Sequence, residues 1–272
     1  MQSTIYNLQS TMIDLHSHIL FDLDDGALTL PESLAMAQLA AADGVRVIAA
    51  TPHGPGSTAC RVYSPALIRE RIGILNAALR NEGLPIEVVG GTEICYSSDV
   101  VDRLKRDELL AYGRSRTILL ELAHNTIPAT LDTALFNLQV AGYRIVLAHP
   151  ERIIEVQQDP NRLLPLIERG ILMQITAEAL LGRQGERLRS TAETLVTHGM
   201  GHLLASDAHG VPPRRPPTLA AARERAAELI GQPAAVAMVT TTPAAVLQGQ
   251  QLKIPPPRRV ERHHIRWWRH GS

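Results

Sequence analysis

The stretch MIDLHSHILFDLDDGALTL, residues 12–30, ends an apolar run in two histidines and places three aspartates close behind them. If residues 12–15 begin a β-strand, His16 and His18 lie two positions apart and point to the same face. Imidazole and carboxylate ligands together suit Zn, Mn or Fe. The stretch therefore predicts a strand whose carboxyl end presents metal ligands.

Six further apolar runs follow, and longer amphipathic segments separate them. Several runs lack polar alternation, which is typical of parallel strands buried on both faces. Two of the segments between them, residues 31–44 and 64–83, start with Pro or Ser and end in Gly, as helices do. This alternation predicts βα units around a parallel sheet, and seven units favour a closed or nearly closed α/β barrel over an open sheet. The predicted strands span 12–15, 45–51, 86–91, 117–122, 144–149, 171–176 and 202–207, and the predicted helices span 31–44, 64–83, 98–110, 130–141, 160–169, 185–199 and 218–230.

Polar side chains stand at the carboxyl ends of six of these seven strands. Such ends converge at one mouth of a barrel, where active sites lie, so residues far apart in the sequence would meet in one pocket. The sixth strand ends in Gln-Ile-Thr and supplies no ionisable group. The residues at the other ends are His16 and His18, then His53, Glu93 and Glu121, then His149 and Arg152, and last Asp207 and His209.

The size of this set indicates more than one metal ion. With Asp25 it holds five histidines and four acids, so two or three ions with a bridging carboxylate are expected. So many converging imidazoles and carboxylates would leave buried charge uncompensated if no metal were bound. Any one of these histidines alone would more often be a surface or core residue, but the joint pattern favours a metal site. Asp22 and Asp24 are interpreted as turn residues around Gly26.

Three more histidines lie near predicted element ends. His198 stands at a helix end and His202 at the start of a strand, away from the predicted site, so neither is expected to be a ligand. His124 follows the fourth strand and could line the mouth, so its role stays open.

Composition narrows the function classes. A formal net charge of zero and 3% aromatic residues argue against a nucleic-acid-binding surface. Two cysteines, no basic-apolar leader and no uninterrupted apolar span predict a cytoplasmic protein without a transmembrane segment. Cysteine-based phosphatase chemistry is excluded, because Ala66 and Val101 stand where the Cys-x5-Arg motif requires arginine after Cys60 and Cys95.

The motifs DLHSHIL…DDG, ATPH, GTEI, LLEL, AHPER and SDAH…RPP occur in this order and resemble the polymerase and histidinol phosphatase (PHP) superfamily. Within it the chain is similar to the manganese-dependent protein-tyrosine phosphatases of bacterial capsule and exopolysaccharide operons. The resemblance implies a distorted, TIM-like (β/α)7 barrel that holds two to three divalent ions, Mn first and Fe or Zn as alternatives. The metal ligands it implies are His16, His18, Asp25, His53, Glu93, Glu121, His149, Asp207 and His209. It also implies that Arg152 and Arg215 hold phosphate, with Arg214 as the alternative to Arg215.

The extent of the resemblance and the composition of the two termini predict a domain division, and the resemblance also implies a substrate. Residues 12–252 would form the barrel, after an N-terminal extension of residues 1–11. Residues 253–272, rich in Pro, Arg and Trp, would form a flexible, solvated tail, although weak contact with a membrane surface or an acidic partner is the alternative. The substrate would be a phosphotyrosine protein, namely the tail of a cognate bacterial tyrosine kinase.

Other functions compete with this interpretation. A small-molecule phosphatase of the histidinol-phosphate kind or another phosphoesterase of the same superfamily is the nearest alternative. An amidohydrolase would place a metal-bridging lysine where this chain has Glu121. A degenerate barrel that serves as a kinase-binding scaffold is the non-enzymatic alternative, and it has no need of nine converging ionisable side chains.

Overall fold

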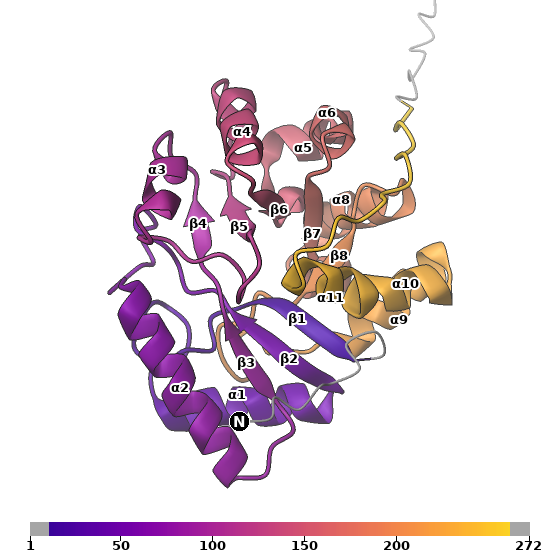
Figure 1. The fold of residues 1–272 in the computed structure, drawn as a ribbon. Coiled ribbons are helices and arrows are strands. Elements are labelled where there is room, and N and C mark those ends of the chain that lie inside the picture. The colour runs from indigo at the N-terminus through magenta and orange to yellow at the C-terminus, as the bar shows by residue number, and fades with distance from the viewer. Residues whose placement is uncertain (1–10, 262–272) are drawn as a thin grey trace, which may run out of the picture.

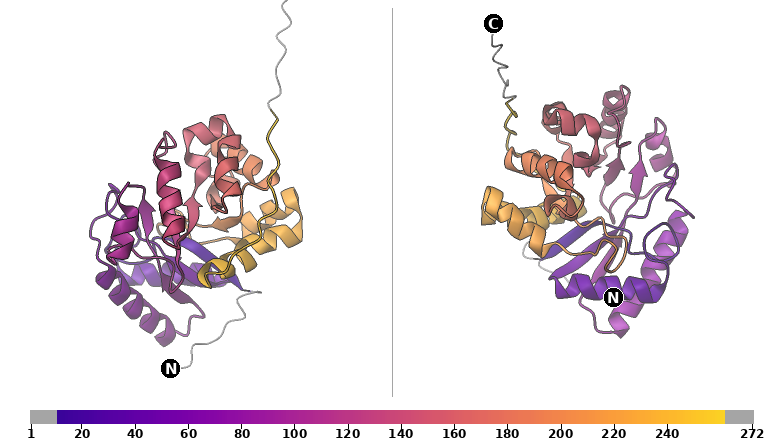
Figure 2. Two further views of the ribbon diagram at one scale, coloured as in Figure 1. Left: turned by 45° about the horizontal axis from the view of Figure 1, so that its top comes forward. Right: turned by 180° about the vertical axis from the view of Figure 1, so that it is seen from behind.

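The structure, a computed structural model, describes residues 11–261 and shows parallel strands surrounded by helices (Figure 1, Figure 2). The strands are β1 Met12–Ser17, β2 Val45–Ala50, β3 Glu87–Gly90, β4 Glu93–Cys95, β5 Thr117–Glu121, β6 Arg144–Ala148, β7 Leu172–Thr176 and β8 Leu203–Ala205. The helices are α1 Leu30–Ala42, α2 Pro65–Asn81, α3 Val100–Lys105, α4 Leu131–Val140, α5 Ile154–Gln158, α6 Leu164–Glu168, α7 Ala177–Leu180, α8 Glu186–Thr197, α9 Ala220–Ile230, α10 Gln232–Val239 and α11 Thr241–Leu247. Short 3₁₀ helices cover Pro150–Arg152 (η1) and Pro160–Leu163 (η2).

The strands form two parallel sheets that together make the barrel wall. One sheet has the order β1-β2-β3 and the other the order β4-β5-β6-β7-β8. The two sheets meet at the carboxyl ends of β1 and β8, where the His18 N–H donates to the Ala208 carbonyl and the Asp207 N–H to the His16 carbonyl, both at 2.8 Å. The prediction of a distorted barrel of parallel strands is confirmed.

The distortion lies between β3 and β4. The sequence predicts one strand over 86–91, but the chain leaves the first sheet after Gly90 and joins the second at Glu93. A Cβ at Gly91 would lie 3.1 Å from Thr51 and 3.2 Å from Tyr112, so a side chain here would crowd both neighbours at the bend. Tyr112 fills the barrel interior beside this bend. Eight strands therefore stand in residues 11–261 where seven were predicted.

The helix predictions hold best where capping residues are clear. Thr29 accepts a hydrogen bond from the Glu32 N–H at the start of α1, and Ser64 accepts one from the Leu67 N–H at the start of α2. The helix predicted over 160–169 is wrong in detail, because η2 and α6 share that range and each starts with a proline in its first turn. Helices α10 and α11 were not predicted at all.

Helix α11 packs at the amino-terminal end of the barrel, where the Thr117 hydroxyl donates to the Val246 carbonyl. Ala244 and Val246 of α11 pack with Leu15 of β1 inside the barrel. Beyond α11 the chain passes the carboxyl end of α8, where the Arg258 N–H donates to the His198 carbonyl at 2.8 Å (Figure 2). The start of the predicted tail is thus bonded to the barrel, while its tryptophan-containing part and nearly all of the predicted N-terminal extension lie outside the described residues. Within residues 11–261, none of the helices combines the length and apolar character needed to cross a membrane.

Candidate metal centre

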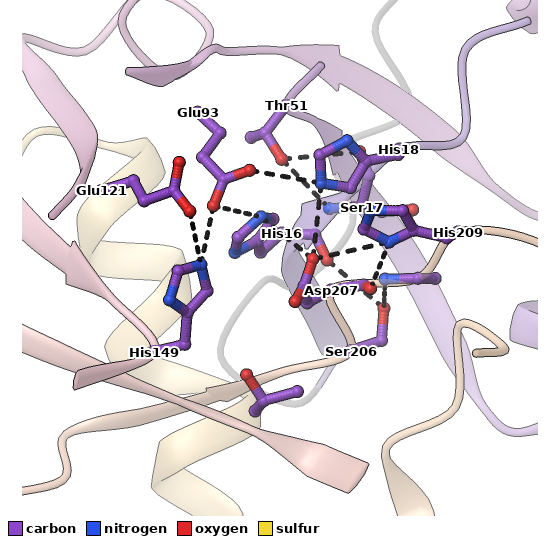
Figure 3. A network of polar contacts seen from close by, with 12 residues as sticks. His16, Ser17, His18, Thr51, Glu93, Glu121, His149, Ser206, Asp207 and His209 are labelled. Atoms are coloured by element: carbon purple, nitrogen blue, oxygen red, sulfur yellow. Dashed lines mark hydrogen bonds and ion pairs between the residues drawn. The ribbon is translucent and has the colours of Figure 1, made fainter. Parts of the chain in front are cut away.

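The structure brings all nine predicted ligand residues to the mouth formed by the carboxyl ends of the strands. Figure 3 shows seven of them, namely His16, His18, Glu93, Glu121, His149, Asp207 and His209. They come from at least six different strands or the loops that follow them. Within this set, His16, His18, Glu93, His149 and Asp207 are buried, whereas Asp25, His53, Glu121 and His209 border an open cavity of about 490 Å³. A larger groove of about 1110 Å³ lies beside β3, α2 and the segment 107–116, but none of the nine residues lines it.

Glu93 lies at the centre of the cluster. Its Oε1 is 2.8 Å from His149 Nε2 and 3.3 Å from His16 Nε2. Its Oε2 is 2.9 Å from His53 Nδ1 and 3.4 Å from His18 Nε2. One carboxylate therefore contacts imidazoles from β1 and from the loops after β2 and β6, which is the placement expected of a bridging ligand.

Asp207 forms the second shared contact. Its Oδ1 lies 3.4 Å from the Nε2 atoms of both His16 and His18, which confirms that these two side chains point to the same face. Its Oδ2 lies 2.5 Å from an Arg152 guanidinium nitrogen and 3.1 Å from one of Arg215. The two carboxylate oxygens thus face different groups, the histidines on one side and the arginines on the other.

Hydrogen bonds behind the cluster orient the first two histidines. His16 Nδ1 donates to Gln174 Oε1 at 2.8 Å, and His18 Nδ1 donates to Asp24 Oδ2 at 2.7 Å. Both acceptors are oxygens, so Nδ1 carries the proton of each neutral ring and the Nε2 lone pair points into the cluster. Such partners orient metal-binding histidines in proteins generally.

Several atoms at the centre of the cluster have no hydrogen-bond partner among the described residues. The Nε2 atoms of His16 and His18, His53 Nδ1 and Glu93 Oε2 are all buried in this way. Unpartnered buried polar atoms are costly, and here these nitrogen and oxygen atoms face one another. A cation is the group that satisfies such an arrangement, so the residues present fit a metal centre.

The distances between these atoms support the same conclusion. Two donor atoms that each lie about 2.1 Å from one ion, at angles between 90° and 120°, are about 3.0–3.6 Å apart. The contacts of His16 and His18 with the two buried carboxylates measure 3.3–3.4 Å. Asp25 Oδ1 lies 3.6 Å from His53 Nε2 and 3.3 Å from His209 Nε2. These separations exceed ordinary hydrogen-bond lengths and match pairs of ligands on one ion.

The charge balance shows how strongly the site attracts positive charge. Burial would raise the pKa of Glu93, but the surrounding imidazoles, His16 first, hold it well below its usual value. Burial would lower the pKa of His18, yet Asp24 and the other nearby carboxylates hold it well above its usual value. Burial and the charge of Arg152 lower the pKa of His149, so this imidazole stays neutral and able to bind a cation.

Two residues of the cluster have left-handed backbone conformations. His149 has φ 32° and Asp207 has φ 51°, and each directly follows or closely follows the end of a strand. Such conformations cost about 1–3 kcal/mol each in a residue other than glycine and cluster at functional sites. The sharp turn they make redirects each side chain into the mouth immediately after its strand ends.

The three arginines of the predicted set have different surroundings. Arg152 and Arg215 are mostly buried and converge on the same Asp207 oxygen beside the cavity. Arg214 instead pairs with Glu32 at 3.1 Å and donates to the carbonyls of Asp25 and Gly26. Arg214 therefore ties down the loop that carries Asp25, and Arg215 lies closer to the centre of the site.

Three polar residues of the site were not recognised in the sequence. Asp24 was interpreted as a turn residue, and it does accept the Gly26 N–H, but it is buried and also binds His18 and the His53 N–H. Gln174 lies on β7, the strand that offered no ionisable group. Asp14, buried on β1, accepts hydrogen bonds from the N–H and the hydroxyl of Ser206, and burial raises its pKa to about 6. These three residues are recognisable as part of the site only from the folded structure, in which all three side chains are buried.

Comparison with known proteins identifies the family. Residues 12–248 match the family described as capsular polysaccharide synthesis, CpsB/CapC. The chain belongs to the CpsB/CapC family. It is 35% identical over 260 residues to the tyrosine-protein phosphatase YwqE of Bacillus subtilis, which covers 93% of this chain and 98% of YwqE. It is 30% identical over 217 residues to the tyrosine-protein phosphatase CpsB of Streptococcus agalactiae, which covers 78% of this chain and 88% of that protein.

Solved structures agree with this assignment to the CpsB/CapC family. A structure from work on YwqE and on CpsB of Streptococcus pneumoniae, described as metal-dependent tyrosine phosphatases, superposes with a TM-score of 0.86 at 35% identity. It covers 92% of this chain and 100% of the other. An organophosphorus hydrolase variant from Deinococcus radiodurans, 15% identical with a TM-score of 0.54, shares the barrel fold alone. The resemblance stated from the motifs is thereby confirmed.

Proposed function

We propose that this protein is a metal-dependent protein-tyrosine phosphatase. The observation that carries the proposal is the buried cluster of unpartnered imidazole nitrogens and carboxylate oxygens, flanked by Arg152 and Arg215 in an open cavity. The names of the CpsB/CapC relatives, which match over most of the chain, supply the activity.

The nine residues of the cluster divide into three groups that would hold the ions. His16, His18 and Asp207 form one group, and His18, Asp25, His53 and His209 form the second. Glu121 and His149 would contribute to the third, and Glu93 would be shared between groups. Imidazole and carboxylate without thiolate suit Mn, Fe or Zn, and we favour Mn because four of the nine ligands are carboxylates. Bound divalent ions would supply Lewis-acid stabilisation and an activated water for attack on phosphorus.

The residues around the cluster have roles of their own in this reaction. Arg152 and Arg215 would bind the non-bridging oxygens of the phosphate, since the guanidinium fork matches phosphate geometry. Asp207 holds both guanidinium groups in position before the substrate arrives. A tyrosine leaving group is a phenolate, which needs less protonation than an alkoxide, so these groups suffice without a covalent intermediate on the protein.

The family description supports a proposal for the physiological substrate. We propose that the protein removes phosphate from a tyrosine kinase of capsule or exopolysaccharide synthesis, most simply from the kinase's tail, and that it does so in the cytoplasm. The description of the CpsB/CapC family and the two free cysteines support this assignment.

A comparison of three substrates tests the proposed function. Chelator-treated full-length protein is given Mn²⁺ and offered a phosphotyrosine peptide, histidinol phosphate or a short oligonucleotide, and phosphate or nucleotide release is measured. The proposal predicts that the peptide has the highest kcat/KM. Preference for histidinol phosphate would identify a small-molecule phosphatase, cleavage of the oligonucleotide would identify a nuclease, and no turnover of any substrate would favour a binding scaffold.

A further inference from the structure

His124 lies at the mouth of the barrel, and none of the roles described above includes it. It stands in the loop between β5 and α4, three residues after Glu121, and its side chain is 53% exposed. It lines the same cavity as Arg152 and Arg215. The sequence left its role open, so its contacts decide what it does.

The imidazole of His124 faces the outermost group of the cluster. His124 Nε2 lies 3.7 Å from Glu121 Oε1, and the same oxygen lies 3.8 Å from His149 Nε2. The His124 and His149 rings stand nearly perpendicular, at 83°, with centroids 5.6 Å apart. One donor atom from each of the three residues lies within 4.8 Å of the others.

These contacts are too long for hydrogen bonds but suit ligands of one ion. Side-chain hydrogen bonds have donor–acceptor distances of about 2.7–3.2 Å. Two ligand atoms about 2.1 Å from a common ion reach about 3.6 Å apart at 120° and slightly more at wider angles. The ion-pair contacts of Glu121 among the described residues are these two histidines, which leaves its carboxylate available to a cation between them.

The backbone holds His124 in this place despite its exposure. The Ile154 N–H donates to the His124 carbonyl at 2.7 Å. Ile154 is the first residue of α5 and lies two positions after η1, which itself directly follows His149. The loop after β5 and the loop after β6 are therefore bonded to each other beside the site. This bond fixes the backbone from which the His124 side chain reaches towards Glu121.

We propose that His124 is a further metal ligand, completing with Glu121 and His149 the coordination of the outermost ion of the cluster. The inference rests on the proposed metal-dependent function and adds a tenth residue to the nine ligands. Without His124 that ion would have two side chains of this group and a share of Glu93, and the added imidazole would increase its affinity and limit its exchange with solvent.

Calorimetric titration of Mn²⁺ into chelator-treated full-length protein tests the assignment. Loss of groups that only orient metal ligands costs about 10- to 100-fold in affinity, so loss of a direct ligand should cost at least about tenfold. We expect His124→Ala to lower the affinity for one Mn²⁺ ion by that factor and to leave the affinities for the other ions unchanged. His124→Glu, which keeps a donor atom at similar reach, should restore most of the lost affinity. Asn125→Ala, at the exposed next position, controls for disturbance of the loop.

The possible results separate this inference from the proposed function. Identical Mn²⁺ isotherms for wild type and His124→Ala, with wild-type phosphatase activity present, would overturn the role of His124 alone. Unchanged binding with reduced turnover would also overturn it, since His124 would then contact substrate rather than metal. A wild-type protein that binds no Mn²⁺ and releases no phosphate would overturn the proposed function together with this inference.

Discussion

Replacement of Asp24 by asparagine tests how the site prepares its metal ligands. Asp24 is buried, and its two oxygens accept from His18 Nδ1 at 2.7 Å, the Gly26 N–H at 2.9 Å and the His53 N–H at 3.0 Å. All three partners are donors, so either orientation of an asparagine amide places its NH₂ group against an N–H. In the orientation that faces His18, the ring must accept at Nδ1 and carry its proton on Nε2, which removes the metal-binding lone pair.

The size of the effect follows from the number of ligands that Asp24 positions. Loss of one orienting partner typically weakens metal binding about 10- to 100-fold. Asp24 supports both His18 and the segment of His53, so we expect the upper end, about 100-fold or about 2.7 kcal/mol, for the Mn²⁺ affinity of Asp24→Asn. Phosphatase activity at limiting Mn²⁺ should fall in parallel and recover in part at high Mn²⁺.

A neighbouring aspartate provides the matched control. Asp22 has an exposed side chain and a positive φ of 59° in the turn before Asp24, and it contacts none of the nine ligands. Asp22→Asn should therefore bind Mn²⁺ as the wild type does, measured by the same calorimetric titration. Equal affinities for the Asp24→Asn and wild-type proteins would refute the reasoning that this carboxylate sets the tautomer of His18.

Three other side chains give further expectations. Burial lowers the pKa of His202 from 6.5 to about 4, so protonation of this imidazole favours the unfolded chain below pH 6.5. In urea melts, the unfolding free energy of the wild type should therefore fall by about 2.5 kcal/mol more than that of His202→Asn between pH 7.5 and 4.5. Equal losses in the two proteins would contradict this. Arg152→Ala should lower kcat/KM for a phosphotyrosine peptide at least about 100-fold, whereas the surface substitution Arg69→Ala should leave it unchanged. Equal kcat/KM values for Arg152→Ala and the wild type would exclude phosphate binding by Arg152. The buried Tyr112 hydroxyl has no hydrogen-bond partner among the described residues, so Tyr112→Phe should raise the unfolding free energy by about 1 kcal/mol; a decrease would indicate a missed partner.

The sequence predicted the ligand positions well because barrel topology links them to strand ends. A parallel strand buried on both faces is recognisable as an apolar run, and the polar residue that ends it must lie at the mouth. His53 and His149 illustrate this, since each lies just beyond the end of its strand and its side chain reaches Glu93.

The sequence could not predict features that depend on packing between distant segments. The break between β3 and β4 lies where Tyr112 enters the barrel beside Gly91, and this proximity of residues from different loops cannot be read from the sequence. Asp22 and Asp24 look alike in the sequence, but the folded loop buries Asp24 and leaves Asp22 exposed. Helices α10 and α11 lie in a run of Ala, Val and Thr with two prolines, in which no amphipathic period marks a helix.

The central claim is that bound metal at this cluster enables hydrolysis of phosphotyrosine. The most direct measurement is phosphate release from a phosphotyrosine peptide by chelator-treated protein before and after addition of Mn²⁺, for the wild type and for His149→Ala. The account predicts no release without metal, release by the wild type after Mn²⁺ is added, and little or none by His149→Ala. Release that is unaffected by chelation, or that persists at the wild-type rate in His149→Ala, would contradict it.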